Sequence, residues 1–479
     1  MQGPRHGGDA NAATALGWTP VEAPRKQSGE RTGRGLATHP WAFAALLACA
    51  ACGADAPLSH LPERSGLNVV VVSFDALRAD ALGAYGYGRR TSPNIDRLAR
   101  QGVLFERAYA VSPVTPSSFA AAFTGNHPNR SFRRWRLVGT SIAEYFSDAG
   151  YSTAAFMNNP HLDPVRGFER GFDTYETFDG WADEPILGQV QNWIAAEASE
   201  PFFLWVHWID PHTPWDWLPE AKHLYDETNT QAGQVGSGLK FKVHDSTELR
   251  RLRNLYDGEV FACDAIFARL VATLSERGLL QRTIVLLTSD HGEEFMEHGW
   301  LQHGQLNGEN MRIPWILLHP DQDTGLRVPD LVSQLDILPT LAGLVGIALP
   351  ENLDGRDLRM VGGDVDPLLG VANTSGQFQQ ASIQSAGRKL IVECGPRVRK
   401  GTHAPVQFYD LTKDPREAEN LALMRADEAT RLEERMWNAL GVAGCEDLRM
   451  HADQGPDREL EGLDEDAVRR LEALGYLDR

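Results

Sequence analysis

Residues 68–75 read NVVVVSFD, a continuous β-branched run that ends in the carboxylate of Asp75. Because apolar residues fill nearly every position instead of alternating with polar ones, this run predicts a strand buried on both faces of a sheet. Similar runs predict further buried strands. They are STAAFMN (152–158), FFLWVHWID (202–210), TIVLLTSD (283–290) and PWILLHP (314–320).

Segments with helical periodicity separate these strands. They cover residues 92–102, 142–149 and 249–278. Strands that alternate with helices predict an α/β fold, in which a large, mostly parallel sheet is flanked by helices on both faces.

The pattern changes after an apolar helix predicted at 333–346. Residues 362–385 have a loop-like composition, and strand patterns follow at 388–394 and 407–411, before two helical stretches near the end. The final stretch is amphipathic, which predicts that it docks on the core. A polar, Gly-rich stretch at 221–246 predicts an insertion or a loop.

The N-terminal region contains WAFAALLACAACGADAP (41–57), whose apolar part is too short to span a bilayer. It follows scattered basic residues and ends in small ones, as a secretory signal does. Leu46 to Cys49 resemble a bacterial lipobox, in which Cys49 becomes a lipid anchor. We therefore expect an exported protein, either periplasmic or held at a membrane as a lipoprotein; a disordered tail is the alternative.

The whole-chain composition limits the partners. The 479 residues include 46 basic and 65 acidic ones, a formal net charge of −19. This balance argues against a nucleic-acid partner, which needs a basic surface, but a local cationic site could still bind a small anionic substrate. Cys263, Cys394 and Cys445 are widely scattered, so no disulfide framework is expected. Nothing in the sequence indicates the oligomeric state.

Three of the predicted strands end in a carboxylate: Asp75, Asp210 and Asp290, the last followed by His291. In open α/β sheets, ligands bind at the carboxyl ends of the strands. A single strand-end Asp is more often a cap or a turn former. Three of them, with several histidines near in sequence, favour a functional site.

The stretch SDHGEEFMEHGWLQHG (289–304) places Asp290 beside His291 and adds His298 and His303. Carboxylate oxygens and imidazoles together suit a divalent cation. A solvated acidic loop is the alternative, because three glutamates lie in the same stretch. In WIDPHTPW (208–215), prolines flank His212 and restrict its backbone, which suits a general acid or an anion contact but also an ordinary Pro-rich turn.

The stretch SPVTPSSFAAAFTG (112–125) predicts a loop that runs into a short helix. Thr115 occupies the expected N-cap and Pro116 the first helical position. Because helix N-termini bind anions, Thr115 is either a cap only or also an attacking oxygen.

Taken together, these segments resemble the sulfatase family of the alkaline phosphatase superfamily. The resemblance runs in order from about residue 67 to residue 477. It rests on VVVSFDALRADALGAYGY, TSPNIDRLARQGVLFERAYA, the 112–125 segment, FFLWVHWIDPHTPW, SDHGEEFMEHG, LDILPTLAGLVG with LDGRDL, FYDLTKDPREAENLA and LEALGYL.

Such enzymes hydrolyse sulfate or phosphate esters by in-line attack of a metal-bound nucleophile. The resemblance implies that Asp75, Asp290 and His291 are metal ligands and that Thr115 completes the set. Ca, Mn, Mg or Zn would suit these ligands, as one ion or two.

The resemblance also implies contacts to the substrate. His212 and His303 are expected to contact the substrate anion or the leaving group, or to bind a second ion. Asp210, His207 and Arg78 are weaker substrate-binding candidates.

The chain departs from the family pattern C/S-x-P-S-R, whose Cys or Ser is oxidised to formylglycine. Counting back from Gly125 places Thr115 at that position, whereas alignment on Pro-Ser places Val114 there. Ala76 stands where a second Asp is usual, and the family's Arg and the Lys after the His-Gly pair are missing. A formylglycine hydrate can expel sulfate by collapsing to the aldehyde, a route closed to Thr. A Thr alkoxide can still attack phosphorus.

We therefore expect an exported, metal-dependent hydrolase of phosphoric esters that uses Thr115 and acts on a small anionic ester. One alternative is a sulfuric ester hydrolase with an unconventional nucleophile, and another is an inactive, anion-binding module. Residues 1–66 are expected to form the export segment and a disordered leader, 67–348 the catalytic domain, and 349–479 a small C-terminal α+β subdomain that completes the fold.

Overall fold

The structure is a computed structural model of the chain. It describes residues 56–180, 183–215, 225, 246–322, 324–374, 377–395, 406–452 and 462–473. Residues 1–55, with Cys49, lie outside the described residues, and so does nearly all of the Gly-rich stretch at 221–246. The expectation of a disordered leader up to residue 66 is wrong for residues 56–66, because Leu58 and Leu61 are buried in the core.

The central strand of the large sheet is β1 (Asn68–Phe74). It lies between β7 (Phe202–Trp208) and β8 (Thr283–Ser289) and runs parallel to both. All three strands are buried at every position, as their continuous apolar runs predict. Beyond β7, β5 (Ser152–Met157) and β6 (Thr174–Thr177) continue the parallel part of the sheet.

On the other side of β8 the sheet becomes mixed. β12 (Trp315–Leu318) pairs antiparallel with β8 and with β2 (Val103–Tyr109). β11 (Arg312–Ile313) is antiparallel to β2, and β13 (Leu326–Ser333) is parallel to it. The prediction of a large, mostly parallel sheet is confirmed.

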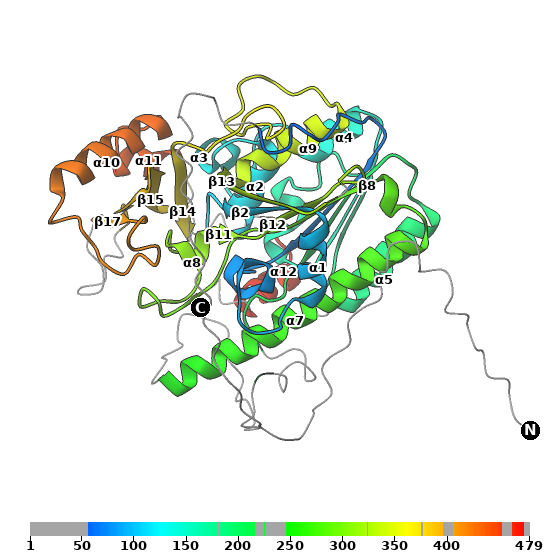
Figure 1. The fold of residues 1–479 in the computed structure, drawn as a ribbon, viewed down its shortest axis with the longest axis horizontal. Coiled ribbons are helices and arrows are strands. Elements are labelled where there is room, and N and C mark those ends of the chain that lie inside the picture. The colour runs from blue at the N-terminus through cyan, green and yellow to red at the C-terminus, as the bar shows by residue number, and fades with distance from the viewer. Residues whose placement is uncertain are drawn as a thin grey trace, which may run out of the picture.

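Helices cover both faces of this sheet (Figure 1). One face carries α1 (Pro93–Gln101), α5 (Asp183–Ala196) and α7 (Ser246–Glu276). The other carries α2 (Thr115–Thr124), α4 (Ile142–Asp148) and α9 (Ile337–Val345). Successive β1 residues point to opposite faces, so Val69 packs with the second helix set and Val70 with the first. Both faces need an apolar residue, which explains the unbroken run.

A separate antiparallel sheet forms the C-terminal subdomain. Its order is β14 (Leu368–Thr374), β15 (Gln377–Ser385), β16 (Arg388–Glu393) and β17 (Val406–Asp410). Helices α10 (Ala426–Leu440) and α11 (Cys445–Ala452) lie beside it, at the left of Figure 1. The domain boundary near residue 348 stays a prediction.

The prediction of a loop at 362–385 is wrong, because β14 and β15 occupy most of this segment. Leu369 of β14 lies opposite Ile383 of β15, and both are buried in the core of the small sheet. The other face of β15 carries polar residues that are buried as well: the side chain of Gln380 accepts a hydrogen bond from the Leu306 backbone. A strand whose second face is polar but buried has a loop-like composition.

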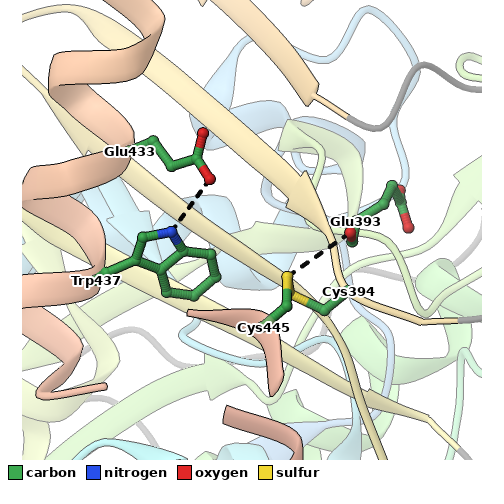
Figure 2. The surroundings of a disulfide bond; sticks show 5 residues. All are labelled: Glu393, Cys394, Glu433, Trp437 and Cys445. Atoms are coloured by element: carbon green, nitrogen blue, oxygen red, sulfur yellow. Dashed lines mark hydrogen bonds between the residues drawn. A yellow bond between two sulfur atoms is a disulfide. The ribbon is translucent and has the colours of Figure 1, made fainter. Parts of the chain in front are cut away.

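The expectation of no disulfide is also wrong, since Cys394 and Cys445 are bonded (Figure 2). Cys394 follows β16 and Cys445 opens α11, so the bond ties the small sheet to the helix. The pair could not be predicted from spacing, because the two cysteines are 51 positions apart in the sequence. Among the described cysteines, Cys263 is a buried thiol.

The last described helix, α12 (Glu465–Ala473), returns to the large domain, where it contacts the short helix η3 (Pro160–Leu162). Ala467 and Leu471 are fully buried, which confirms the expected core docking. Within the described part of the chain, no helix combines the length and hydropathy needed to cross a membrane.

Candidate active site

The candidate site is built at the carboxyl edge of three neighbouring strands. Phe74, at the end of β1, pairs with Ser289 of β8 and with Trp208 of β7. The next residues in the chain are therefore delivered to one edge, as the sequence predicts. Asp75 follows β1 and Asp290 follows β8, and both are fully buried.

Asp75, Asp290 and His291 form a compact cluster of ligand atoms. One donor atom from each lies within 4.8 Å of the others. His291 Nε2 is 3.3 Å from Asp290 Oδ2 and 3.9 Å from Asp75 Oδ1. Oxygen and imidazole ligands converging at this spacing suit a divalent cation.

The chemistry of this cluster fits a cation. His291 Nδ1 lies 2.9 Å from the Gly292 carbonyl oxygen, which only accepts, so Nδ1 carries the proton and Nε2 directs a lone pair at the carboxylates. Within the described residues, Asp75 Oδ1 and Asp290 Oδ2 are buried without a hydrogen-bond partner. Burial, followed by the charge of Asp290, raises the pKa of Asp75 to about 7. Buried anionic oxygens of this kind need a positive partner.

Thr115 lies against the same cluster. Its Oγ1 is 3.3 Å from Asp75 Oδ2 and 3.4 Å from His291 Nε2. The prediction that Thr115 caps α2 is wrong by one residue: Val114 is the N-cap, and Thr115 begins the helix with Pro116 behind it. Because Thr115 does not serve as a side-chain cap, its hydroxyl is directed at the carboxylate and imidazole instead.

The N-terminal turn of α2 is tied to the same strand edge. Ser118 Oγ donates to the backbone carbonyl of Asp290 at 2.7 Å and also lies 2.9 Å from Gln334 Oε1. These contacts couple the position of Thr115 to the loop that carries Asp290. Hydrogen bonds therefore link the helix end to the strand edge.

Two further histidine rings, those of His212 and His303, lie beside the cluster. The ring centre of His303 lies 4.2 Å from that of His291 and 4.9 Å from that of His212. His212 Nδ1 is 2.5 Å from the Thr213 carbonyl oxygen, and His303 Nδ1 is 3.1 Å from Glu293 Oε1. Burial lowers the pKa of both His212 and His303 to about 4, so both rings are neutral at neutral pH. The structure thus brings Thr115, His212 and His303 together with the three candidate ligands.

A comparison with known protein families decides the family. Residues 67–347 match the model of the family described as Sulfatase, which is more than half of the chain. The chain belongs to the sulfatase family. Members of this metal-dependent family are hydrolases that act on ester bonds.

Two curated sulfatases match this chain over most of their own length. An arylsulfatase of Clostridium perfringens is 24% identical over 442 residues, covering 74% of this chain and 90% of the relative. A choline-sulfatase of Rhizobium meliloti is 25% identical over 436 residues, covering 74% of this chain and 82% of the relative.

Solved structures share the sulfatase fold. The phosphonate monoester hydrolase of Agrobacterium radiobacter superposes with a TM-score of 0.64 at 20% identity, covering 78% of this chain and 95% of that one. A structure in complex with its substrate D-glucosamine-2-N,6-O-disulfate has a TM-score of 0.64 at 19% identity, covering 82% and 99%. Proteins with this fold thus include a phosphonate monoester hydrolase and a protein whose substrate is a sulfated sugar.

In this sulfatase-family chain, Arg78 and His298 contact residues outside the cluster of candidate ligands. Arg78 is buried and makes two bonds to Asp80, one to Glu297 and one to the Glu293 carbonyl, so it braces the 293–297 loop. His298 binds Glu309, 3.1 Å away.

Neither His207 nor Asp210 belongs to the group of three candidate ligands. His207 Nε2 is 3.5 Å from Asp75 Oδ2, while its Nδ1 lies 3.0 Å from Ser73 Oγ. His207 therefore supports a candidate ligand from the sheet side. Asp210 lies beside the carboxyl of Asp183, and burial raises the pKa of Asp210 to about 7.

Sequence reasoning missed three residues of this site. Asn159 Nδ2 donates to Asp75 Oδ2 at 2.5 Å, and Glu293 contacts His303. His161 is buried near the histidine group, where burial lowers its pKa well below the usual value. Asn159 and His161 come from MNNPHLD (157–163), the loop after β5. That β5 is a parallel neighbour of β7 is the signal that could have directed attention to it.

Proposed function

We propose that this sulfatase-family hydrolase cleaves small anionic phosphoric esters with Thr115 as its nucleophile and a divalent cation held by Asp75, Asp290 and His291. The observation that carries the proposal is the position of Thr115 Oγ1, within 3.4 Å of both Asp75 and His291 at the start of α2. A hydroxyl in that place is a nucleophile and a ligand at once, since it shares the cluster with the carboxylates.

The residues divide the reaction between them. Thr115 Oγ attacks phosphorus and gives up its proton, the P–O bond to the leaving group breaks, and a proton is transferred to the departing oxygen, which leaves as the alcohol. Water then attacks the phosphothreonine, the P–Oγ bond breaks, one proton of the water returns to Thr115 Oγ, and phosphate leaves. The positive end of α2 favours the charged form of Thr115 and the anionic ester. When bound, the cation supplies Lewis acidity to the ester oxygens and to the hydroxyl.

His212 and His303 are proposed to contact the ester and its leaving group. Both rings are buried beside the cluster, and in both the Nδ1 atom is held by an acceptor, Thr213 O or Glu293 Oε1. That arrangement assigns contact with the ester to Nε2 in each ring. His207 and Asn159 are proposed to support Asp75, and Arg78 to brace the loop.

The threonine favours phosphorus over sulfur. Formylglycine chemistry requires a Cys or Ser precursor, and the counting that matches Gly125 places Thr115 there. The second candidate is sulfuric ester hydrolysis, favoured by the arylsulfatase and choline-sulfatase relatives. The presence of Asp75, Asp290 and His291 together argues against an inactive binding module, because idle buried carboxylates are costly.

Export is part of the proposal. The Cys394–Cys445 disulfide supports it, because such bonds persist in oxidising compartments. The apolar run at 41–57 and the lipobox-like Cys49 support a lipoprotein in the periplasm or at a membrane.

The experiment is hydrolysis of 4-nitrophenyl sulfate, phosphate and phenylphosphonate by the full chain, with Ca, Mn, Mg or Zn supplied in turn. Thr115→Ala and Thr115→Ser run beside the parent. We expect turnover of phosphorus esters that falls by about 10⁴-fold or more in Thr115→Ala and is partly kept in Thr115→Ser. Sulfate turnover that survives Thr115→Ala would overturn the assignment. Silence on every ester with every ion would favour the binding module.

A further inference from the structure

Glu293 is buried beside the cluster, where it contacts one of the two histidines proposed to bind the ester. Its side chain is fully buried, and Oε1 lies 3.1 Å from His303 Nδ1. Among the described residues, its Oε2 has no hydrogen-bond partner. Burying a carboxyl oxygen without a hydrogen-bond partner costs free energy, so the position of Glu293 beside a candidate catalytic ring needs an explanation.

A small hairpin places Glu293 opposite His303. Strand β9 (Glu294–Phe295) pairs antiparallel with β10 (Leu301–Gln302), with Phe295 opposite Leu301 and Glu294 opposite Gln302. Glu293 directly precedes β9 and His303 directly follows β10. One further step in the same register therefore brings the two side chains together.

The hairpin is held on several sides. Glu294 Oε1 accepts hydrogen bonds from the backbone N–H groups of His298 and Trp300 and so closes the turn. Arg78 donates to the Glu293 carbonyl at 2.9 Å. Gln302 donates to Thr213 Oγ1 at 3.1 Å, which links the hairpin to the loop of His212. Glu293 is thus presented by a fixed backbone, as a positioning role requires.

We propose that Glu293 is a positioning residue for His303. By engaging Nδ1, its carboxyl sets the orientation of the imidazole and assigns the reaction to Nε2, in the manner of the carboxylate that orients a histidine in hydrolase triads. The contact itself is independent of substrate, but its consequence for turnover rests on the proposed function. The rival explanation is that Glu293 only closes the hairpin.

The test compares Glu293→Leu, which keeps the volume but lacks the acceptor, with Glu293→Gln, which keeps an acceptor oxygen. Glu294→Gln is the matched control, because Glu294 holds the turn without a contact to His303. Each is made in the full chain and on a His303→Gln background. Kinetics use 4-nitrophenyl phosphate and an alkyl phosphate, whose leaving group is poorer. Nitrogen-15 spectra report the His303 ring, assigned by its absence in His303→Gln.

We expect Glu293→Leu to lower kcat by about 10- to 100-fold with little change in KM. The loss should be larger for the alkyl ester, small in Glu293→Gln, and absent on the His303→Gln background. The His303 ring signals should move in Glu293→Leu and stay in place in Glu294→Gln. If Glu293→Leu fails to fold, Glu293→Ala replaces it in the same comparisons.

Two results would overturn the positioning role. One is an unchanged His303 ring spectrum in Glu293→Leu, and the other is an equal kcat loss with and without His303. Because the spectra need no turnover, they decide the matter even if no ester is hydrolysed. Parent turnover that survives Thr115→Ala would defeat the proposed nucleophile while leaving the Glu293–His303 contact as measured.

Discussion

Thr115 Oγ1 lies 3.3 Å from Asp75 Oδ2, although 40 positions separate the two residues in the chain. Asp75 leaves the central strand of the sheet, and Thr115 opens a helix that packs on one face of it. The contact therefore joins the sheet edge to a helix N-terminus. The carboxylates at the sheet edge attract a cation, and the helix N-terminus attracts an anion. An enzyme that holds an anionic ester on a metal ion needs both.

Asp75→Asn should stabilise the metal-free protein. At pH 8 we expect a gain on the order of 1 kcal/mol in the free energy of unfolding, because the amide removes repulsion with the buried Asp290. Burial and the Asp290 charge raise the pKa of Asp75 to about 7. The folded chain therefore bears the full cost of ionisation above about pH 7. Below about pH 4 both states hold the proton, so the gain should vanish there.

Urea unfolding with EDTA at pH 8 and at lower pH measures this effect. The same variant should lose the rise in Tm that the parent shows when a divalent cation is added. Asp427→Asn, in the exposed first turn of α10, is the control and should show neither change. An Asp75→Asn protein that is less stable at pH 8, or that still gains Tm with the cation, contradicts the ligand assignment.

Asn159→Ala should lower the affinity for the divalent cation and leave the stability of the fold largely unchanged. Asn159 donates to Asp75 Oδ2 at 2.5 Å, and its own Oδ1 accepts from the His161 backbone, which fixes the amide. Loss of such support typically lowers metal affinity by about 10- to 100-fold. Calorimetric titration with Mn measures it. Asn158→Ala is the neighbouring control, since Asn158 binds the Ile209 backbone; equal affinity losses in the two variants would refute a specific role for Asn159.

The strand-end residues were predictable because their signal is local. A continuous apolar run encodes a strand buried on both faces, and parallel neighbours end at one edge of the sheet. The sequence therefore predicts that Asp75 and Asp290 lie close together. For the nucleophile the sequence left two alignments with the family pattern: one placed Thr115 at that position and the other placed Val114 there. The structure has the Thr115 hydroxyl against Asp75 and leaves Val114 as the helix N-cap.

Other parts of the site depend on partners that no local pattern reveals. Asn159 reaches Asp75 across 84 positions, and Glu293 meets His303 only through the register of a two-residue hairpin. The polar face of β15 has a loop-like composition because Gln380 is buried against the Leu306 backbone rather than against apolar residues. Such features follow from how elements pack, which composition and periodicity do not encode.

Lys389→Met should destabilise the protein strongly. Lys389 Nζ lies 2.7 Å from Glu417 Oε1, and both side chains are only 4% exposed. Glu417 Oε2 also accepts from Asn307, in the loop after His303. Removing one partner of a buried pair costs about 3–5 kcal/mol, because the other charge stays buried. Chemical unfolding checks this, and Lys389→Met with Glu417→Gln should recover part of the loss.

The surface pair Arg327–Glu106 is the control for Lys389, since both side chains are at least 36% exposed. Arg327→Met should cost less than about 1 kcal/mol. A cost for Lys389→Met as small as that of Arg327→Met would show that water reaches the buried pair.

Removal of the Cys394–Cys445 bond should weaken the C-terminal subdomain. The bond closes a 51-residue separation and ties β16 to α11. Loops of this size are worth about 2–4 kcal/mol, so the double variant Cys394→Ser/Cys445→Ser should lose that much stability. Unfolding with and without dithiothreitol measures this loss: the parent should become less stable in the reductant and the double variant should not.

Because Cys263 is a buried lone thiol, Cys263→Ser should leave the response to dithiothreitol intact. A parent that ignores dithiothreitol while its unfolded form reacts with thiol reagents at all three positions would mean that the bond does not form.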